Sequence, residues 1–379
     1  MITQGGPCDL LSNVIERGLC IGCGACIGLC PYFRTYRGKT AMLFPCDASE
    51  GRCFDCCPRV EVDLDDLSRR HCDAPYRADP LGHYRSIHTA QAGEKVGGGP
   101  FQAGGTVSAV VSFALERGYL DGAVLTDREG LLPVPRCVTE PGEVLQCGTS
   151  KYTAAPTLSA VNRAMSDGYR RIGAVTTPCQ AQALALMQSR RREEHDGTDP
   201  VQLVVGIFCT WSLDFRDFEA FIKDRIPVDS IAMIDIPPPP AEIMEIHLTD
   251  GSKQELPLDE IRELVPPGCS YCLDMTAEFT DISVGVLEGR PDMNTLIIRT
   301  ERGQRLVDEA VDAGYLIVGE MARDAQDHLT WAAGRKKGRA LVRAADEGVL
   351  NGQNGDRRAV VRLSETVVQS ILAAQRGCA

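Results

Sequence analysis

The stretch CIGCGACIGLCP, residues 20–31, predicts the fold of the N-terminal region, because it spaces four cysteines as C-x2-C-x2-C-x3-C-P. The four are Cys20, Cys23, Cys26 and Cys30. Three cysteines at this spacing can bind different irons of one [4Fe–4S] cluster, and in bacterial ferredoxins the cysteine before the proline binds the other cluster. The stretch therefore predicts a small bacterial-ferredoxin-like module with two [4Fe–4S] clusters.

A second group of cysteines follows with the irregular spacing C-x6-C-x2-C-C-P; its members are Cys46, Cys53, Cys56 and Cys57. Successive side chains of an extended backbone point to opposite sides, so the adjacent Cys56 and Cys57 can serve different clusters. We assign one cluster to Cys20, Cys23, Cys26 and Cys57 and the other to Cys30, Cys46, Cys53 and Cys56. The alternative is a single cluster, with one cysteine of the adjacent pair left over.

Other uses of cysteine fit this region less well. A disulfide framework is typical of secreted domains, and residues 1–18 have neither a basic n-region nor an apolar h-region. Structural zinc takes four ligands and does not require a third cysteine at this spacing. Five cysteines have no ligand spacing and are predicted to be structural: Cys8, Cys72, Cys137, Cys147 and Cys378.

Composition limits the functional class. The chain has 379 residues, and 52 acidic side chains against 40 basic ones give a net charge of −12, which argues against nucleic-acid binding. Its 17 cysteines indicate a reducing compartment and redox or metal use. No apolar run approaches the roughly 18 residues of a membrane span. We therefore expect a cytoplasmic protein without direct membrane insertion.

The sequence divides into four predicted parts: an iron–sulfur module at 1–65, a linker at 66–97, an α/β domain at 98–330 and a helical C-terminal extension at 331–379. In the third part, predicted helices (103–118, 157–168, 181–191, 215–225) alternate with predicted strands (120–126, 171–177, 201–208). Such alternation favours a mixed sheet with flanking helices. Asp250–Gly251 predicts the turn of an antiparallel hairpin.

Four further cysteines lie in the α/β part. Cys179 and Cys209 each follow a predicted strand, and Cys269 and Cys272 form a C-x2-C pair. Functional groups gather at strand ends in α/β domains, so the four can form one thiolate set. Two alternatives stay open from spacing alone: Cys179 and Cys209 are ordinary buried cysteines, or the four bind zinc.

A glycine-rich stretch and a basic stretch each have two interpretations. Gly104 and Gly105 immediately precede a predicted helix, where free N–H groups can hold the phosphates of a nucleotide. A helix N-cap loop explains these glycines equally well, and the G-x-G-x-x-G fingerprint is absent. The basic run at 334–343 is either a solvated helix face or a docking site for an acidic partner.

Residues 102–318 resemble the beta subunit of coenzyme F420-reducing hydrogenase and its relatives. The resemblance rests on motifs in the same order and at similar spacing: QAGGTVSAVVSFALERGYLDGAV (102–124), GTSKYTAAPTLSAV (148–161), PCQAQAL (178–184), VVGIFC (204–209), GCSYCLDMTAEFTDISVG (268–285) and NTLIIRTERGQRLVDEAV (294–311). It implies an α/β flavoprotein domain that binds FAD and a third [4Fe–4S] cluster. The implied cluster ligands are Cys179, Cys209, Cys269 and Cys272.

The resemblance also suggests where FAD binds. Gly104, Gly105 and Thr106 would hold its diphosphate, while Ser150, Lys151 and Tyr152 match the family's Gly-Thr-Lys-Tyr segment and would add a cation and a ring. The cofactors carry out the redox chemistry, so no catalytic side chain is expected.

The implied function is an oxidoreductase subunit that interconverts hydride transfer at FAD with one-electron transfer through three clusters. Its carrier would be F420, ferredoxin or a nicotinamide, and its partners would be hydrogenase, formate dehydrogenase or heterodisulfide reductase subunits. Two alternatives remain: a ferredoxin-dependent reductase of an organic substrate, similar to 7-hydroxymethyl chlorophyll a reductase, and a pure electron relay.

Overall fold

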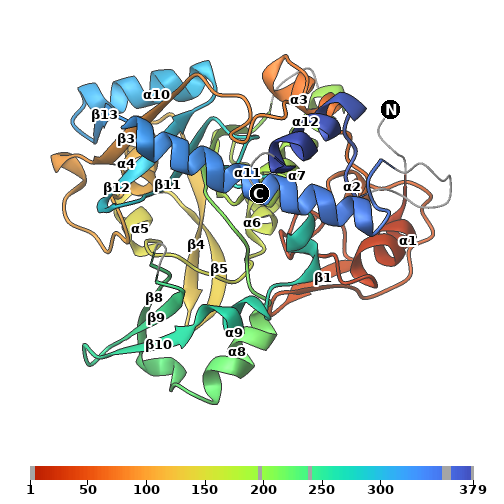
Figure 1. The fold of residues 1–379 in the computed structure, drawn as a ribbon, viewed down its shortest axis with the longest axis horizontal. Helices are drawn as coiled ribbons and strands as arrows, with labels where there is room; N and C mark the ends of the chain where they lie inside the picture. The colour runs from red at the N-terminus through yellow and green to blue at the C-terminus, as the bar shows by residue number, and fades with distance from the viewer. Residues whose placement is uncertain (1–4, 195–198, 238–240, 352–359, 377–379) are drawn as a thin grey trace.

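An eight-stranded mixed sheet forms the centre of the fold (Figure 1). The structure is a computed structural model that describes residues 5–194, 199–237, 241–351 and 360–376. In sheet order the strands are β13 (Leu316–Glu320), β3 (Ser86–Ala92), β12 (Arg290–Ile298), β11 (Ile282–Leu287), β7 (Val201–Ile207), β6 (Ile172–Thr176), β4 (Gly122–Glu129) and β5 (Leu132–Val138). Strands β11, β7, β6 and β4 are parallel to one another, and the strands outside them pair antiparallel. The predicted mixed α/β architecture is confirmed.

Helices cover both faces of this sheet because its parallel strands are apolar on both sides. In β4, Ala123 and Leu125 pack in one hydrophobic cluster with α4 (Thr106–Glu116) and α10 (Glu301–Asp312). The intervening Val124 packs in a second cluster with α6 (Thr157–Ser166) and α7 (Pro178–Glu194). This alternation follows from the two-residue period of a strand. A short helix, α5 (Pro141–Gln146), lies beside α4.

Strand β3 corrects the predicted linker over residues 66–97. It pairs antiparallel with β12 on one side and β13 on the other, so it lies within the sheet. Residues 64–72 form helix α3 (Leu64–Cys72), and a 3-10 turn, η2 (Glu94–Val96), follows β3. The strand was missed because SIHTAQA is polar, and only Thr89 and Ala90 within it are fully buried.

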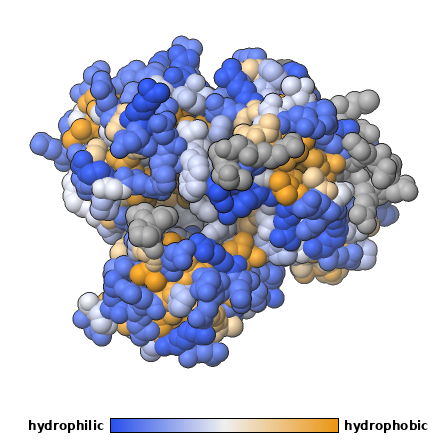
Figure 2. Space-filling view, viewed as in Figure 1, coloured by the Kyte–Doolittle hydropathy of each residue, from blue (hydrophilic) through white to orange (hydrophobic). Residues whose placement is uncertain are grey.

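A smaller three-stranded antiparallel sheet lies below the main sheet in Figure 1. It contains β8 (Ile231–Asp235), β9 (Ile243–Leu248) and β10 (Lys253–Pro257), packed with α8 (Phe215–Lys223) and α9 (Leu258–Arg262), and it is preceded by the 3-10 turn η3 (Val228–Ser230). Gly251 has a φ of +84°, so the predicted hairpin at Asp250–Gly251 is confirmed. Figure 2 shows that the surface is hollowed between this part and the rest of the molecule.

The cysteine-rich N-terminal region has little regular structure. Its elements are α1 (Pro7–Leu10), the π-helical turn η1 (Leu11–Ile15), the hairpin strands β1 (Phe33–Tyr36) and β2 (Lys39–Met42), and α2 (Arg52–Asp55). The 3-10 turn η4 (Pro267–Tyr271) and two C-terminal helices, α11 (Arg323–Asp346) and α12 (Glu365–Arg376), complete the fold.

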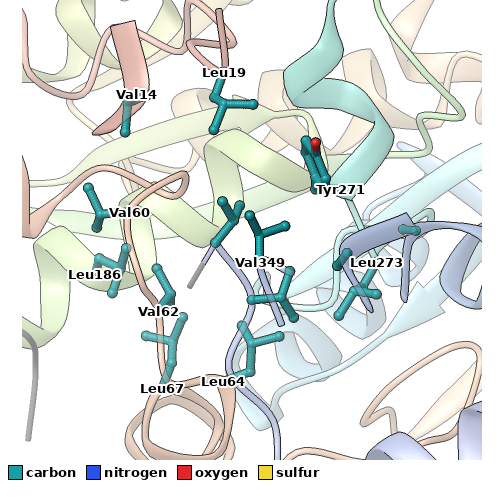
Figure 3. Close-up of a cluster of buried hydrophobic side chains, with 14 of the residues drawn as sticks. Val14, Leu19, Val60, Val62, Leu64, Leu67, Leu186, Tyr271, Leu273 and Val349 are labelled. Atoms are coloured by element: carbon teal, nitrogen blue, oxygen red, sulfur yellow. The ribbon is translucent and has the colours of Figure 1, made fainter. Parts of the chain in front are cut away.

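The C-terminal helices form a common core with this N-terminal region. Val14, Leu19 and Val62 belong to the same buried cluster as Leu273 and Val349 (Figure 3). Leu341, Val361 and Ile371 are also buried in it. The predicted C-terminal extension therefore contains the helices α11 and α12, and these helices pack in one core with the cysteine-rich region.

Among the described residues, no helix is both long and apolar enough to cross a membrane.

Candidate iron–sulfur and flavin site

The first predicted thiol set surrounds one pocket. This pocket, with about 370 Å³ of empty space including open solvent, is lined by Cys20, Cys23, Cys26 and Cys57, with apolar residues such as Leu10 and Val14. The loop bends through Gly22 and Gly24, whose φ values of +65° and +82° favour glycine. The structure thus brings together the four cysteines that spacing assigns to one cluster, including the one from the irregular group.

The second predicted set lies beside the first. Burial raises the pKa of Cys53 to about 11, and the neighbouring thiols of Cys30 and Cys46 contribute to the increase. Cys56 donates from Sγ to the backbone carbonyl oxygen of Cys53 at 3.7 Å. Burial raises the pKa of Cys56, and the thiols of Cys57, Cys23 and Cys53 add to the increase, so Cys56 is close to members of both sets.

The third set forms at the carboxyl ends of two neighbouring parallel strands. Cys179 follows β6 in the first turn of α7, and Cys209 follows β7. Cys209 donates its N–H to the carbonyl of Met275 at 2.9 Å, which ties it to the segment that carries Cys269 and Cys272. Burial raises the pKa of Cys179 to about 11, and the thiols of Cys272 and Cys269 add to the increase. Binding a metal cluster here would therefore release protons.

The first and third sets are neighbours because their loops are in direct backbone contact. A side chain at Gly268 would meet the carbonyl oxygen of Leu19 at 2.3 Å, and one at Gly24 would meet that of Pro156 at 2.6 Å. Leu158 donates its N–H to the carbonyl of Cys23 at 3.1 Å. The third set, at the carboxyl ends of β6 and β7, therefore adjoins the first set, and the first set adjoins the second.

The described cysteines form no disulfide. All of those from Cys8 to Cys272 are free thiols; Cys378 lies outside the described residues. No group of three or more His, Cys, Asp or Glu side chains in the described ranges is arranged to hold a single metal ion.

Two buried cations border the third set, and the sequence did not predict either. Arg59 is 4% exposed and Lys336 is 6% exposed. Burial lowers the pKa of Arg59, but the thiolates of Cys272, Cys179 and Cys269 outweigh this effect and raise it overall. Lys336 donates to the carbonyls of Cys209 and Asp274 at 2.6 and 2.7 Å. These cations fit a bound group with net negative charge, as a thiolate-ligated cluster has.

The same observation corrects the interpretation of the basic run at 334–343. Lys336 and its neighbour Lys337 are buried, and Lys337 forms an ion pair with Glu278 at 2.8 Å. At these two positions the run is neither a solvated face nor a docking surface. A pair of lysines inside a run of exposed charges gives no sequence signal of burial.

The glycine loop of the predicted flavin site leads into helix α4. Gly105 has a φ of +74° and caps α4. The N–H of Thr106 donates to Asn294 Oδ1 at 3.2 Å, so this donor is already used within the protein. The hydroxyl of Thr106 is fully buried and has no hydrogen-bond partner among the described residues. The helix N-cap interpretation thus explains the glycine, while the free hydroxyl fits a ligand.

Gln102, which precedes the glycine loop, is hydrogen-bonded to the second predicted flavin segment, residues 150–152. The side chain of Gln102 accepts the N–H of Ser150 at 2.6 Å and donates to the hydroxyl of Tyr152 at 3.3 Å. Lys151 is turned back onto its own loop, where it donates to the carbonyl of Gly148 at 2.6 Å, and burial lowers its pKa to about 8. Gln102 was missed because glutamine has no ligand signature of its own.

Thr106→Val is expected to weaken flavin binding about 2- to 10-fold, the equivalent of one ordinary hydrogen bond. The substitution preserves shape and removes only a hydroxyl that has no hydrogen-bond partner in the part of the chain that the structure describes. The apo-protein should therefore keep its melting temperature, while equilibrium dialysis with FAD reports weaker binding. A lower melting temperature with unchanged FAD affinity would contradict this role.

Comparison with known proteins shows where the chain belongs. Residues 87–162 match the N-terminal model, and residues 169–324 the C-terminal model, of the coenzyme F420 hydrogenase/dehydrogenase beta subunit. The chain is 33% identical over 244 residues to the coenzyme F420 hydrogenase subunit beta of Methanococcus voltae, covering 62% of this chain and 85% of that protein.

Two further comparisons extend this result. The chain is 29% identical over 311 residues to a coenzyme F420-dependent sulfite reductase of Methanocaldococcus jannaschii, which covers 78% of this chain but only 46% of that protein. The fold is similar to a chain of the F420-reducing [NiFe] hydrogenase complex from Methanosarcina barkeri, with a TM-score of 0.65 and 23% identity over 70% of this chain and 93% of that one. The two family models together cover well over half of the sequence, and the chain is an oxidoreductase of the coenzyme F420 hydrogenase/dehydrogenase beta subunit family.

Proposed function

We propose that this chain is an iron–sulfur flavoprotein subunit that links a two-electron carrier, coenzyme F420 in the first instance, to a one-electron partner. When bound, FAD would supply the exchange between hydride and single electrons, and three [4Fe–4S] clusters would carry the single electrons. The observation that carries the proposal is the succession of three four-cysteine sets in contacting loops.

The protein's own residues would hold and shield these groups. The twelve proposed cluster ligands are Cys20, Cys23, Cys26, Cys57, Cys30, Cys46, Cys53, Cys56, Cys179, Cys209, Cys269 and Cys272. The proposed flavin contacts are Gly104, Gly105, Thr106, Ser150, Lys151 and Tyr152. Burial of the thiols excludes water, and Arg59 and Lys336 offset negative charge. No side chain is required to act as an acid or base.

The end of the succession favours a partner that accepts or donates single electrons. Cys30 and Cys46 are only partly buried, and the nearby Leu43 and Phe44 are 54% and 61% exposed. The second set therefore reaches toward the surface at Cys30 and Cys46, beside these two exposed apolar side chains. We propose that the chain works within a complex, as the similar hydrogenase chain does. Hydrogenase, formate dehydrogenase and heterodisulfide reductase subunits are the proposed partners.

Anaerobic stopped-flow mixing with one reduced carrier at a time tests the function. With reduced F420, the flavin absorbance band is expected to decrease first. The broad iron–sulfur absorbance should decrease afterwards. NADH, NADPH and reduced ferredoxin are the parallel arms. Faster reduction by ferredoxin, starting at the iron–sulfur absorbance, would favour a ferredoxin-dependent reductase instead. A protein that binds no flavin would contradict the proposal.

A further inference from the structure

Arg59 is buried, and two of its side-chain nitrogens lack a hydrogen-bond partner among the described residues. Its side chain is 4% exposed, Nη1 donates to the carbonyl of the adjacent Pro58 at 3.2 Å, and the thiol of Cys272 also interacts with the guanidinium. Nε and Nη2 have no partner among the described residues. A buried guanidinium in this state costs several kcal/mol unless an anion lies against it. The position therefore requires a negatively charged neighbour.

The neighbours of Arg59 belong to two different thiol sets. It lines the pocket formed by Cys20, Cys23, Cys26 and Cys57. Cys272, Cys179 and Cys269 of the third set also interact with its charge, and the loop of Cys269 touches that of Cys20 where a Cβ at Gly268 would meet the carbonyl oxygen of Leu19 at 2.3 Å. The guanidinium therefore lies between the first and third sets, at the place where their loops touch.

Lys336 provides a useful contrast because it borders one set only. It lies near Cys272, Cys209 and Cys269, and its ammonium group donates to the backbone of Cys209 and Asp274. It is absent from the lining of the first pocket. Arg59 is thus placed to act on two clusters, whereas Lys336 is placed to act on one.

We propose that Arg59 is a positioning residue shared by the first and third clusters, whose charge stabilises the reduced form of both relative to the second cluster. The inference rests on the proposed function, because it requires clusters in both sets. Each reduction adds one electron and no proton, so a fixed positive charge nearby raises the reduction potential. Arg59 would thereby keep electrons on the inner pair of clusters until a partner accepts them.

The test is an anaerobic redox titration of the full-length holoprotein with dithionite, followed by EPR, for four proteins. These are the unsubstituted chain, Arg59→Gln, Arg59→Lys and Lys336→Met. In Arg59→Gln two midpoint potentials should become more negative, and in Arg59→Lys both should stay near their original values. Lys336→Met should lower one potential only, and it should be one of those two. Iron content is measured in parallel.

The matched control is Arg52→Gln, which removes the same charge from an exposed position next to Cys53. Solvent and salt screen an exposed charge, so its three potentials should not move. Unshifted potentials in a fully loaded Arg59→Gln protein would overturn the proposal, as would a shift of one potential only. If Arg59→Gln does not load, a second neutral variant, Arg59→Met, takes its place: two potentials shifted to more negative values support the shared role, and unshifted potentials or a shift confined to one of them contradict it.

Failure of the proposed function gives a separate result. An unsubstituted protein that contains about four iron atoms or fewer has no inner pair of clusters. Both proposals then fail. A protein with about twelve iron atoms and unshifted Arg59→Gln potentials rejects only the role of Arg59.

Discussion

Replacing Cys57 by alanine is expected to lower the iron content from about twelve to about eight atoms per chain, because one [4Fe–4S] cluster loses a ligand. Cys57 lines the pocket of the first set, whereas the adjacent Cys56 is not part of that lining and donates to the backbone carbonyl of Cys53 in the second set. Cys56→Ala should therefore also leave about eight atoms, and the double variant about four. Iron and acid-labile sulfide analysis of anaerobically purified protein gives the counts.

The control for this experiment is Cys137→Ala, since Cys137 lies on β5, outside all three sets. It should keep the full iron content. A single variant of the adjacent pair that also keeps it would identify that cysteine as unnecessary. The EPR spectra add a second criterion: Cys56→Ala and Cys57→Ala should each remove a different signal. Loss of the same signal in both would contradict the assignment of the pair to two clusters.

Lys337→Met is expected to destabilise the folded protein by about 3–5 kcal/mol, because it leaves one charge of a buried ion pair without its partner. Lys337 and Glu278 are 1% and 5% exposed, and their charged atoms are 2.8 Å apart. Within the described ranges, the Glu278 carboxylate would retain a hydrogen bond from the hydroxyl of Tyr76, at 3.3 Å, and the more distant charge of Arg299. Anaerobic urea unfolding of the holoprotein measures the change. The double variant with Glu278→Gln should recover most of it.

The destabilisation caused by Lys337→Met should increase as the pH rises. Burial raises the pKa of Glu278 from its ordinary 4.5 to about 7, even with Lys337 in place. A carboxyl with a raised folded-state pKa contributes most stability below its unfolded pKa and loses that contribution as the pH rises through the folded value. Lys337→Met should therefore be less destabilising at pH 6 than at pH 8. Equal destabilisation at both values, or a double variant no more stable than the single one, would contradict the ion-pair explanation.

The sequence predicted those parts of the fold in which local pattern and tertiary environment agree. The apolar strands β4, β6 and β7 and the helices after them were evident because strands buried on both faces are continuously hydrophobic. The thiol sets were predictable because cluster ligation imposes spacing on the chain. The assignment of Cys57 to the first set needed only the opposite directions of neighbouring side chains.

The sequence did not predict features that depend on distant parts of the chain. Strand β3 is polar, and it is a strand because β12 and β13 supply its hydrogen-bond partners. Lys336 and Lys337 belong to a basic helix but are buried by the segment that contains Asp274 and Glu278. Arg59 follows a Cys-Cys-Pro sequence that predicts nothing about a guanidinium. In each case the deciding contact is more than fifty residues away.

The common core of the two chain ends also determines when the cluster sites can form during synthesis. Val361 and Ile371 complete the core around the cysteines of the N-terminal region, but they leave the ribosome much later than those cysteines. At 5–20 residues per second, the intervening stretch of about 300 residues takes roughly 15–60 s to make. During this time, thiols that are buried in the folded protein remain accessible to oxidants and stray metals. Loading of the N-terminal clusters should thus depend on prior synthesis of the segment that contains Val361 and Ile371.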